Sequence, residues 1–257
     1  MRLDLVTLFP EFFKWPFSHS LLKQACAKQI VEFHLHNPRN FTEDRHRTVD
    51  EKPFGGGPGM ILKPEPVFRC VEKIPQAKRA RVLLLSPRGK PLTQTKASKL
   101  VQWKHLILIC GHYEGVDERV SKHLVDEEIS VGDFVTMGGE GPALCLVEAV
   151  VRFLPGVLDN PESLKEESFS LFGEGKGEQR LEFPQYTRPR IFRDWKVPPV
   201  LLSGNHPAIK KWREKEALNL TRRNRPDLLN LSKPASIGKL ERHRKAKGVN
   251  ADDNGTH

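Results

Sequence analysis

Hydrophobic and polar residues along the first 160 positions follow the two periods that distinguish strands from helices. The strands that this pattern predicts span residues 2–8, 30–36, 81–85 and 105–110. In the second of these, Val31, Phe33 and Leu35 fall on one face, which indicates a half-buried strand. The last two are almost entirely apolar, as in strands of a parallel sheet that helices cover on both faces.

Helical patterns lie between these strands. The predicted helices of this region span residues 18–29, 93–101, 118–124 and 142–153. Thr93 suits the N-cap of the second helix, and Pro142 suits the first turn of the fourth. Strands that alternate with helices predict an α/β domain, which we assign to residues 1–160.

The composition changes after this domain. Residues 161–184 are acidic and contain Gly173, Gly175 and Gly177, so we expect a flexible linker. Residues 206–230 have a helical pattern, so residues 185–238 are expected to form a small, mostly helical domain. The polar tail, residues 239–257, is expected to be disordered.

Charge is distributed unevenly along a chain whose net charge is +10. Residues 186–225 hold eleven Lys and Arg but three Asp and Glu, whereas residues 159–182 hold seven acidic and three basic residues. Clustered cations favour a polyanionic partner, because they neutralise phosphates and release condensed counterions. The basic segment therefore indicates nucleic-acid binding.

The four cysteines form no CxxC pair, which predicts neither a zinc site nor a disulfide framework. Reduced thiols indicate a cytoplasmic protein, and we expect no bound metal. The N-terminus lacks the uninterrupted apolar stretch of a signal peptide. Glu148, Arg152 and Pro155 interrupt the most apolar segment, so no membrane association is expected.

Three glycine-containing segments each follow or interrupt a predicted strand. They are SPRG (86–89), GHYEG (111–115) and VGDFVTMGGE (131–140). Ligands bind at the carboxyl ends of strands in open α/β sheets, and glycine lets backbone approach a ligand closely. None of the three matches a dinucleotide-binding or P-loop pattern, which argues against a nucleotide-phosphate cradle.

A long segment from Asp44 to Met60 contains four glycines and two prolines in its second half. Loops of this length without secondary structure are usually functional or disordered. The segment is either a mobile surface loop or a lid that carries Arg45, His46, Arg47 and Asp50 to an anionic substrate.

Several motifs of the chain resemble those of a known family. They are DRHRTVD, GGGPGM, SPRG, CGHYEGVDERV, VGDFV with GGE, RFLPGVL, YTRP and PPVLLSGNHPAIKKWR. The chain resembles the bacterial tRNA (guanine-N1-)-methyltransferases, TrmD, of the SPOUT class, over nearly all of residues 1–230. The resemblance implies an α/β domain with a deep trefoil knot, a rare exception to unknotted chains. It also implies a homodimer with active sites at the interface.

The implied reaction methylates N1 of the guanosine immediately 3′ of the tRNA anticodon, with S-adenosyl-L-methionine as methyl donor. The implied cofactor residues are Leu85, Ser86, Pro87, Gly111, Tyr113, Glu114, Val131, Gly132, Asp133, Phe134, Val135, Thr136, Gly138, Gly139 and Pro142. The implied substrate residues of the long loop are His46, Asp50 and Pro58.

The resemblance assigns catalysis to Arg152 and Glu167. Guanine N1 carries a proton that a carboxylate must remove, and a guanidinium can stabilise the negative charge that builds on O6. From the residues alone, both side chains are better interpreted as ordinary surface charges. The family has Asp where this chain has Glu167, and it also differs at Thr136, Met137 and Gly141.

The basic C-terminal segment contains an aromatic residue among its cations, a combination that RNA-binding proteins use for phosphates and bases. We expect tRNA contacts from Arg188, Lys210, Lys211 and Arg213, and leave Trp212 with the core. Two alternatives remain open. One is a SPOUT methyltransferase acting on another RNA position or on a ribose oxygen, and the other is an RNA-binding protein with impaired catalysis.

Overall fold

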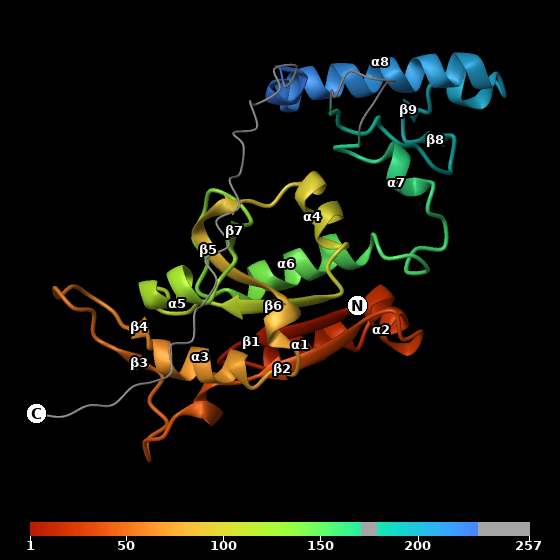
Figure 1. Cartoon of the computed structure of the whole chain (residues 1–257). Coiled ribbons are helices and arrows are strands. Elements are labelled where there is room, and N and C mark those ends of the chain that lie inside the picture. Colours follow the sequence, from red (N-terminus) through yellow and green to blue (C-terminus); the bar gives the residue numbers. More distant parts are fainter. Residues whose placement is uncertain (171–178, 231–257) are drawn as a thin grey trace, which may run out of the picture. The chain divides into compact units, whose positions relative to one another are not determined.

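The computed structural model describes residues 1–170 and 179–230, which form two compact units divided between Glu166 and Glu167 (Figure 1). The predicted tail, residues 239–257, lies outside the described residues. So do residues 231–238 of the predicted C-terminal domain.

A five-stranded parallel sheet forms the centre of the first unit, with strand order β2-β1-β6-β5-β7 (Figure 1). The strands are β1 (Arg2–Val6), β2 (Glu32–His36), β5 (Arg81–Pro91), β6 (His105–Cys110) and β7 (Glu127–Ser130). Every residue of β6 is buried, as its apolar sequence predicted. The α/β prediction is confirmed, and four of these strands were predicted from the hydrophobic pattern.

Helices cover both faces of the sheet. Leu5 and Leu108 point to a core that is completed by α1 (Glu11–Phe17), α2 (Ser20–Ala27), α4 (Gln94–Leu100) and α6 (Glu140–Val151). Val6 and Ile107, one position away, point to the core under α3 (Pro64–Glu72) and α5 (Glu118–His123). This alternation is the period of two that strands impose on their side chains.

Helix starts follow their local chemistry. Thr93 caps α4 by accepting a hydrogen bond from the Lys96 amide at 3.2 Å, as predicted. α6 begins at Glu140, two residues earlier than predicted, and Pro142 lies in its first turn. α1, α3 and β7 were not predicted.

Asp4 introduces a charge into the otherwise apolar sheet, and its side chain is fully buried. Its carboxylate accepts hydrogen bonds from Arg2 (2.6 and 2.9 Å), His36 Nε2 (2.6 Å) and His105 Nε2 (2.7 Å). Burial raises the pKa of Asp4, but these hydrogen bonds outweigh burial and hold the pKa well below its ordinary value. The network ties β1 to β2 and β6.

Two short strands, β3 (Asp50–Glu51) and β4 (Ile61–Leu62), hold the ends of the glycine-rich loop together. Short 3-10 helices span Pro38–Phe41 and Ala77–Arg79. The Leu62 amide donates to the Gly115 carbonyl at 3.0 Å, and the Asp117 amide donates to the Leu62 carbonyl at 3.0 Å. β4 thus anchors the loop beside the segment that follows β6.

The second unit is built around one long helix. Its described elements are β8 (Ile191–Phe192), β9 (Trp195–Lys196), a 3-10 helix (Pro199–Leu202), α8 (His206–Asn224) and a 3-10 helix (Pro226–Asn230). The predicted helical stretch 206–230 is therefore α8 followed by a tighter turn. Ala217, Thr221 and Leu228 are buried in the core of this unit.

The segment predicted as linker 161–184 is shared between the two units. Its first part includes α7 (Ser163–Glu166), which closes the first unit. In the second unit, the Phe169 amide donates to the Arg180 carbonyl at 2.8 Å, and the Leu181 amide donates to Thr221 Oγ1 at 2.9 Å. The described ends of the segment are therefore hydrogen-bonded, whereas a free linker would expose its backbone groups to water.

Among residues 1–170 and 179–230, none of the helices is both long enough and apolar enough to cross a membrane.

Candidate functional site

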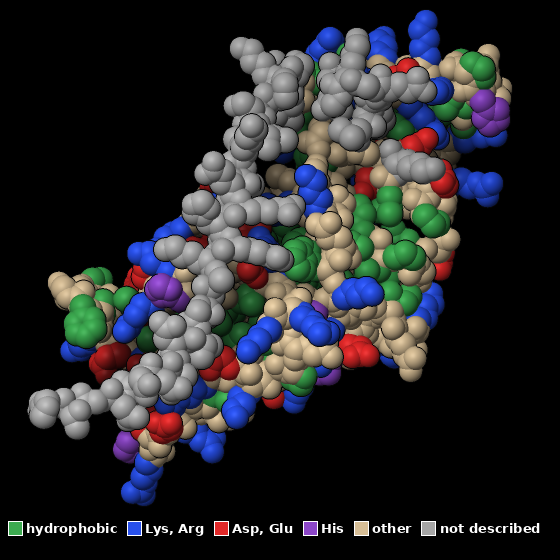
Figure 2. Space-filling model, in the orientation of Figure 1, with side chains coloured by type: hydrophobic (Ala, Val, Ile, Leu, Met, Phe, Trp, Pro, Cys, Tyr) green, Lys and Arg blue, Asp and Glu red, His purple; other side chains and the backbone are tan. Residues whose placement is uncertain are grey.

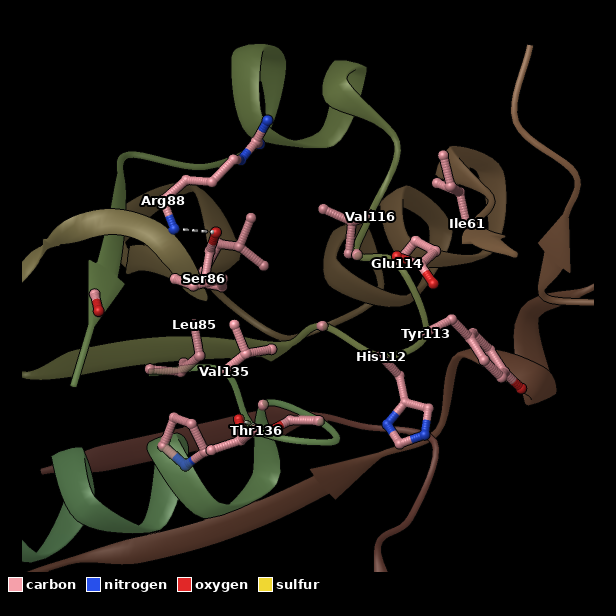
Figure 3. A pocket seen from close by; sticks show the side chains of 18 of the residues that line it. Ile61, Leu85, Ser86, Arg88, His112, Tyr113, Glu114, Val116, Val135 and Thr136 are labelled. Atoms are coloured by element: carbon pink, nitrogen blue, oxygen red, sulfur yellow. Dashed lines mark hydrogen bonds between the residues drawn. The ribbon is translucent and has the colours of Figure 1, made fainter. Parts of the chain in front are cut away.

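A pocket of about 560 Å³ opens at the carboxyl ends of β5, β6 and β7 (Figure 3). Its walls come from residues 84–88, 111–118, 129–131 and 134–139, with Pro142 from the first turn of α6. Ser86 and Arg88 lie across the pocket from Val116 and Glu114 (Figure 3). The site therefore occupies the place where open α/β sheets bind ligands.

Backbone hydrogen bonds hold these walls together. The Gly139 amide donates to the Gly111 carbonyl at 2.7 Å, next to a bridge between His112 and Gly138. The Glu114 amide donates to the Met60 carbonyl at 3.0 Å, so the end of the glycine-rich loop is fixed to the pocket rim. Segments far apart in sequence thus form one site.

Two glycines lie where neighbouring backbone segments come too close for any side chain, Gly89 beside β7 and Gly139 beside the end of β6. A Cβ at Gly139 would be 2.7 Å from Cys110 Cα, and one at Gly89 would be 2.4 Å from the Ile129 amide nitrogen. Gly111 differs, because a Cβ there would touch only the Leu85 carbonyl oxygen at 3.5 Å and a Val116 methyl at 4.0 Å. The fold thus requires glycine at positions 89 and 139. At Gly111, in contrast, a side chain would fit the protein and occupy the pocket wall.

The lining combines apolar side chains with exposed backbone and a few charges. Leu85, Val116, Ile129 and Val135 supply apolar surface. Tyr113 has φ +59°, a conformation that bulky residues rarely adopt, and its ring lies at the rim (Figure 3). Such a pocket suits a ligand with a flat heterocycle that can form hydrogen bonds with the exposed backbone. The ligand could also carry a positive charge, which carboxylates of the pocket would attract.

A buried polar group supports the floor of the pocket. Glu140, which is 5% exposed, accepts a hydrogen bond from Thr7 Oγ1 at 2.7 Å. His112 Nδ1 lies 3.7 Å from the other Glu140 oxygen and makes no hydrogen bond within the described part of the chain. A carboxylate in the first turn of α6 also interacts favourably with the helix dipole. Glu140 therefore fixes the start of α6 against β1.

A family model described as tRNA (Guanine-1)-methyltransferase TrmD matches residues 1–231. The chain belongs to this family. Three of its relatives are proteins named tRNA (guanine-N(1)-)-methyltransferase. The protein from Dictyoglomus turgidum is 55% identical over 89% of this chain and 90% of its own length. Those from Brevibacillus brevis and Gloeobacter violaceus are 52% and 53% identical over 89% of this chain, and over 91% and 98% of their own lengths.

Most residues that the TrmD resemblance assigned to the cofactor line this one pocket. The exceptions are Gly132 and Asp133. Gly132 is held in a tight turn by Ser130 Oγ, which donates to its carbonyl at 2.9 Å, and Asp133 is exposed. The sequence did not identify the lining residues Phe54, Arg88, His112, Val116, Ile129 and Met137. Several of these residues adjoin predicted ones. Their position within the same motifs was the signal that could have identified them.

The predicted substrate residues of the long loop lie outside the pocket lining. His46 and Pro58 are exposed, and Asp50 is half-buried in β3. Their neighbours Pro53 and Phe54 do line the pocket, and Phe54 is 100% exposed. The loop thus reaches the site through residues that were not predicted.

The two predicted catalytic residues are also separate from the pocket. Arg152 is the C-cap of α6, whereas the pocket wall includes Pro142 at the start of this helix. Ten residues of α-helix separate them by about 15 Å along the axis. Glu167 is half-buried and is the first residue of the second unit, whereas its neighbour Glu166 is exposed.

In the second unit, the predicted RNA-binding residues differ in exposure. Arg188, Lys210 and Lys211 are exposed, and Lys and Arg side chains project around α8 (Figure 2). The Arg213 guanidinium lies over the Phe183 ring at 4.6 Å, so this cation also packs within the unit. Trp212 is half-buried, and its ring centroid lies 6.3 Å from that of the exposed Tyr186.

Across residues 1–170 and 179–230, His, Cys, Asp and Glu side chains form no group of three that could hold a metal ion.

Proposed function

We propose that this chain transfers a methyl group from S-adenosyl-L-methionine to N1 of the guanosine immediately 3′ of a tRNA anticodon. Membership of the TrmD family and the pocket at the carboxyl edge of the sheet together support this proposal. The observation that carries it is the convergence of three glycine-containing segments on that pocket.

The pocket residues fit the proposed cofactor. Backbone groups around Gly111 and Gly138 offer hydrogen bonds to an adenine, and Leu85 and Val135 offer it apolar contacts. Glu114 and Asp117 at the rim suit the positive charge of a sulfonium. When bound, the cofactor supplies an activated methyl group.

The chain itself has to provide proton removal and charge stabilisation. In the proposed mechanism the Glu167 carboxylate accepts the proton of guanine N1 as the methyl group is transferred, and the Arg152 guanidinium stabilises the charge on O6. Half-burial of Glu167 favours it over the exposed Glu166 for this role. His46, Asp50 and Pro58 would approach the guanosine when the long loop closes.

A second copy of the chain would complete the site. Arg152 lies at the end of α6 that is distant from the pocket, so the Arg152 of a partner is a better candidate for that site. Phe9, Phe12 and Trp15 form an exposed apolar surface beside the pocket, because Phe9 packs on His112 with ring centroids 4.9 Å apart. We propose that this surface belongs to the homodimer interface.

The trefoil knot is proposed on the resemblance to the TrmD family. The tight packing of residues 131–139 against the end of β6 supports it, since a Cβ at Gly139 would lie 2.7 Å from Cys110 Cα. We assign the second unit to tRNA binding on the charge of residues 186–225, and the protein to the cytoplasm, where tRNA is modified.

Methyl transfer to defined RNAs tests the proposal. The full chain is incubated with methyl-labelled cofactor and two tRNA transcripts that differ only in carrying guanosine or adenosine 3′ of the anticodon. We expect 1-methylguanosine in the first transcript and no label in the second. Label at another nucleotide or on a ribose would favour the alternative substrate, and RNA binding without transfer would favour a binding protein.

A further inference from the structure

The β8–β9 hairpin of the second unit exposes aromatic side chains that lie outside the core. Phe192 is 56% exposed and Trp195 is 66% exposed. Every residue of the hairpin from Ile191 to Lys196 is exposed, so no side chain of this hairpin is part of the core. Isolated two-stranded hairpins are marginally stable, and exposed aromatic patches usually mark interaction sites.

The two rings lie on the same face of the hairpin. Phe192 is directly opposite Trp195, and Ile191 is directly opposite Lys196. Directly paired residues share a face, and neighbours along a strand point to opposite faces. The ring centroids are 6.0 Å apart with an interplanar angle of 47°. Ile191 and Lys196 therefore lie on the reverse face.

A cation accompanies both rings. The Arg193 guanidinium lies 5.4 Å from the Phe192 ring centre and 5.7 Å from the Trp195 ring centre. Arg193 has φ +56°, a left-handed conformation that is strained for every residue except glycine. Glycine would be less strained at this turn position than arginine. The turn therefore carries backbone strain together with a guanidinium group that glycine could not supply.

The surroundings favour a nucleic acid over an apolar protein surface. Between residues 188 and 196 the chain has Arg188, Arg190, Arg193 and Lys196 against the single acid Asp194. Aromatic rings beside cations are the combination that binds unpaired nucleotides, since the rings stack on bases and the cations contact phosphates. An apolar protein partner would leave these charges desolvated.

We propose that Phe192, Trp195 and Arg193 form a stacking platform for an unpaired base of the RNA substrate. This inference rests on the proposed function, because it takes RNA as the substrate. Base stacking tolerates every base, so the platform contributes affinity and positioning rather than a sequence preference. It would orient a loop nucleotide while the basic residues around α8 hold the phosphates.

Equilibrium binding of labelled tRNA to the full chain, measured at several salt concentrations, tests the platform. Trp195→Leu keeps apolar volume but removes the ring, and should weaken binding about 5- to 100-fold with an unchanged salt slope. Trp195→Phe should retain most of the affinity. Arg193→Gly should also weaken binding, although glycine suits the turn.

Ile191→Ala is the matched control, because Ile191 belongs to the same hairpin but lies on the reverse face. It should bind tRNA like the wild type. Equal losses for Ile191→Ala and Trp195→Leu, or no loss for Trp195→Leu, would overturn the platform. A Trp195→Leu chain that changes its oligomeric state instead would assign the rings to a second copy. Methyl transfer by the wild type, run in parallel, separates these outcomes from failure of the proposed function.

Discussion

Glu166 and Glu167 are adjacent and chemically identical, yet only Glu167 is half-buried. We expect Glu167→Gln to lower the rate of methyl transfer about 10²- to 10⁴-fold, which is the usual contribution of a positioned base. Cofactor affinity should not change, because Glu167 does not line the pocket. Single-turnover kinetics on a tRNA with guanosine after the anticodon measure the effect.

Glu166→Gln is the control, and it should react at the wild-type rate. Glu167→Asp should remain active, because the unperturbed pKa values of the two side chains are similar, ~4.3 for Glu and ~3.9 for Asp. Normal turnover by Glu167→Gln would remove this residue from the mechanism.

Two neighbouring glycines should respond in opposite ways to the same substitution. Gly139→Ala places a methyl group 2.7 Å from Cys110 Cα, so we expect a loss of about 1–3 kcal/mol of stability and weaker cofactor binding. A Cβ at Gly141 would meet no heavy atom within 4 Å, and Gly141 lies in α6, so Gly141→Ala should stabilise by about 0.4–1 kcal/mol.

Denaturant unfolding and calorimetric cofactor titration of both variants provide the comparison. An unaffected Gly139→Ala protein would contradict this close contact. This pair also illustrates what sequence could predict: the GGE motif identified Gly139 as a pocket residue, and Gly139 does line the pocket. Sequence could not reveal that its neighbour there is the Cys110 backbone, because such contacts depend on the three-dimensional path of the chain.

At the scale of elements, the Asp4 network joins three strands through one buried carboxylate. Asp4→Asn should destabilise the protein by about 2–5 kcal/mol at pH 7, because it removes the charge that three donors share. The pKa of Asp4 is lowered on folding, so its stabilisation is present above the unfolded pKa of ~3.9. That stabilisation is lost as the pH falls through the folded value.

Urea unfolding of wild type and Asp4→Asn between pH 7 and pH 3 measures this effect. The free energies of unfolding of the two proteins should approach each other as the pH falls below ~4. Asp227→Asn is the control, because it breaks an ion pair with Arg225 that is exposed to water and should change stability little at any pH. A constant difference between wild type and Asp4→Asn across this range would exclude Asp4 as the source of the pH dependence.

Element prediction worked where a single physical signal dominated. The buried strand β6 and the capped helix α4 followed directly from apolar runs and from Thr93. β7 was not predicted because two of its four residues are glutamates, which form ion pairs with Lys96 and Arg88 in the structure. α1 was not predicted because Pro16 lies inside it. In both, tertiary contacts override local propensity.

At the scale of the whole molecule, a shared active site should allow two defective chains to rescue each other. Arg152→Ala keeps the pocket intact, and Gly111→Val fills the pocket wall but keeps Arg152. Each homodimer should be nearly inactive. A purified heterodimer should regain up to half of the wild-type activity, because one pocket is then paired with an intact Arg152 from its partner.

Methyl transfer by tagged and purified heterodimers provides the measurement, and both homodimers serve as controls. Heterodimers as inactive as the homodimers would mean that Arg152 and the pocket act within one chain. The proposal that two chains form each site could not be derived from hydrophobic periodicity. It rests on the length of helix that separates Pro142 from Arg152.

The close backbone contact at Gly139 also bears on the order in which the chain folds. Long-range pairs such as Asp4 and His105, 101 positions apart, form slowly because closing a long loop costs entropy. Gly139 packs against the Cys110 backbone at the end of β6, and Ile129 pairs with β5, so neither contact exists until those strands are in place. We therefore expect newly made chains to assemble the sheet before they complete the pocket, so ligand stabilises the finished state without accelerating the early steps.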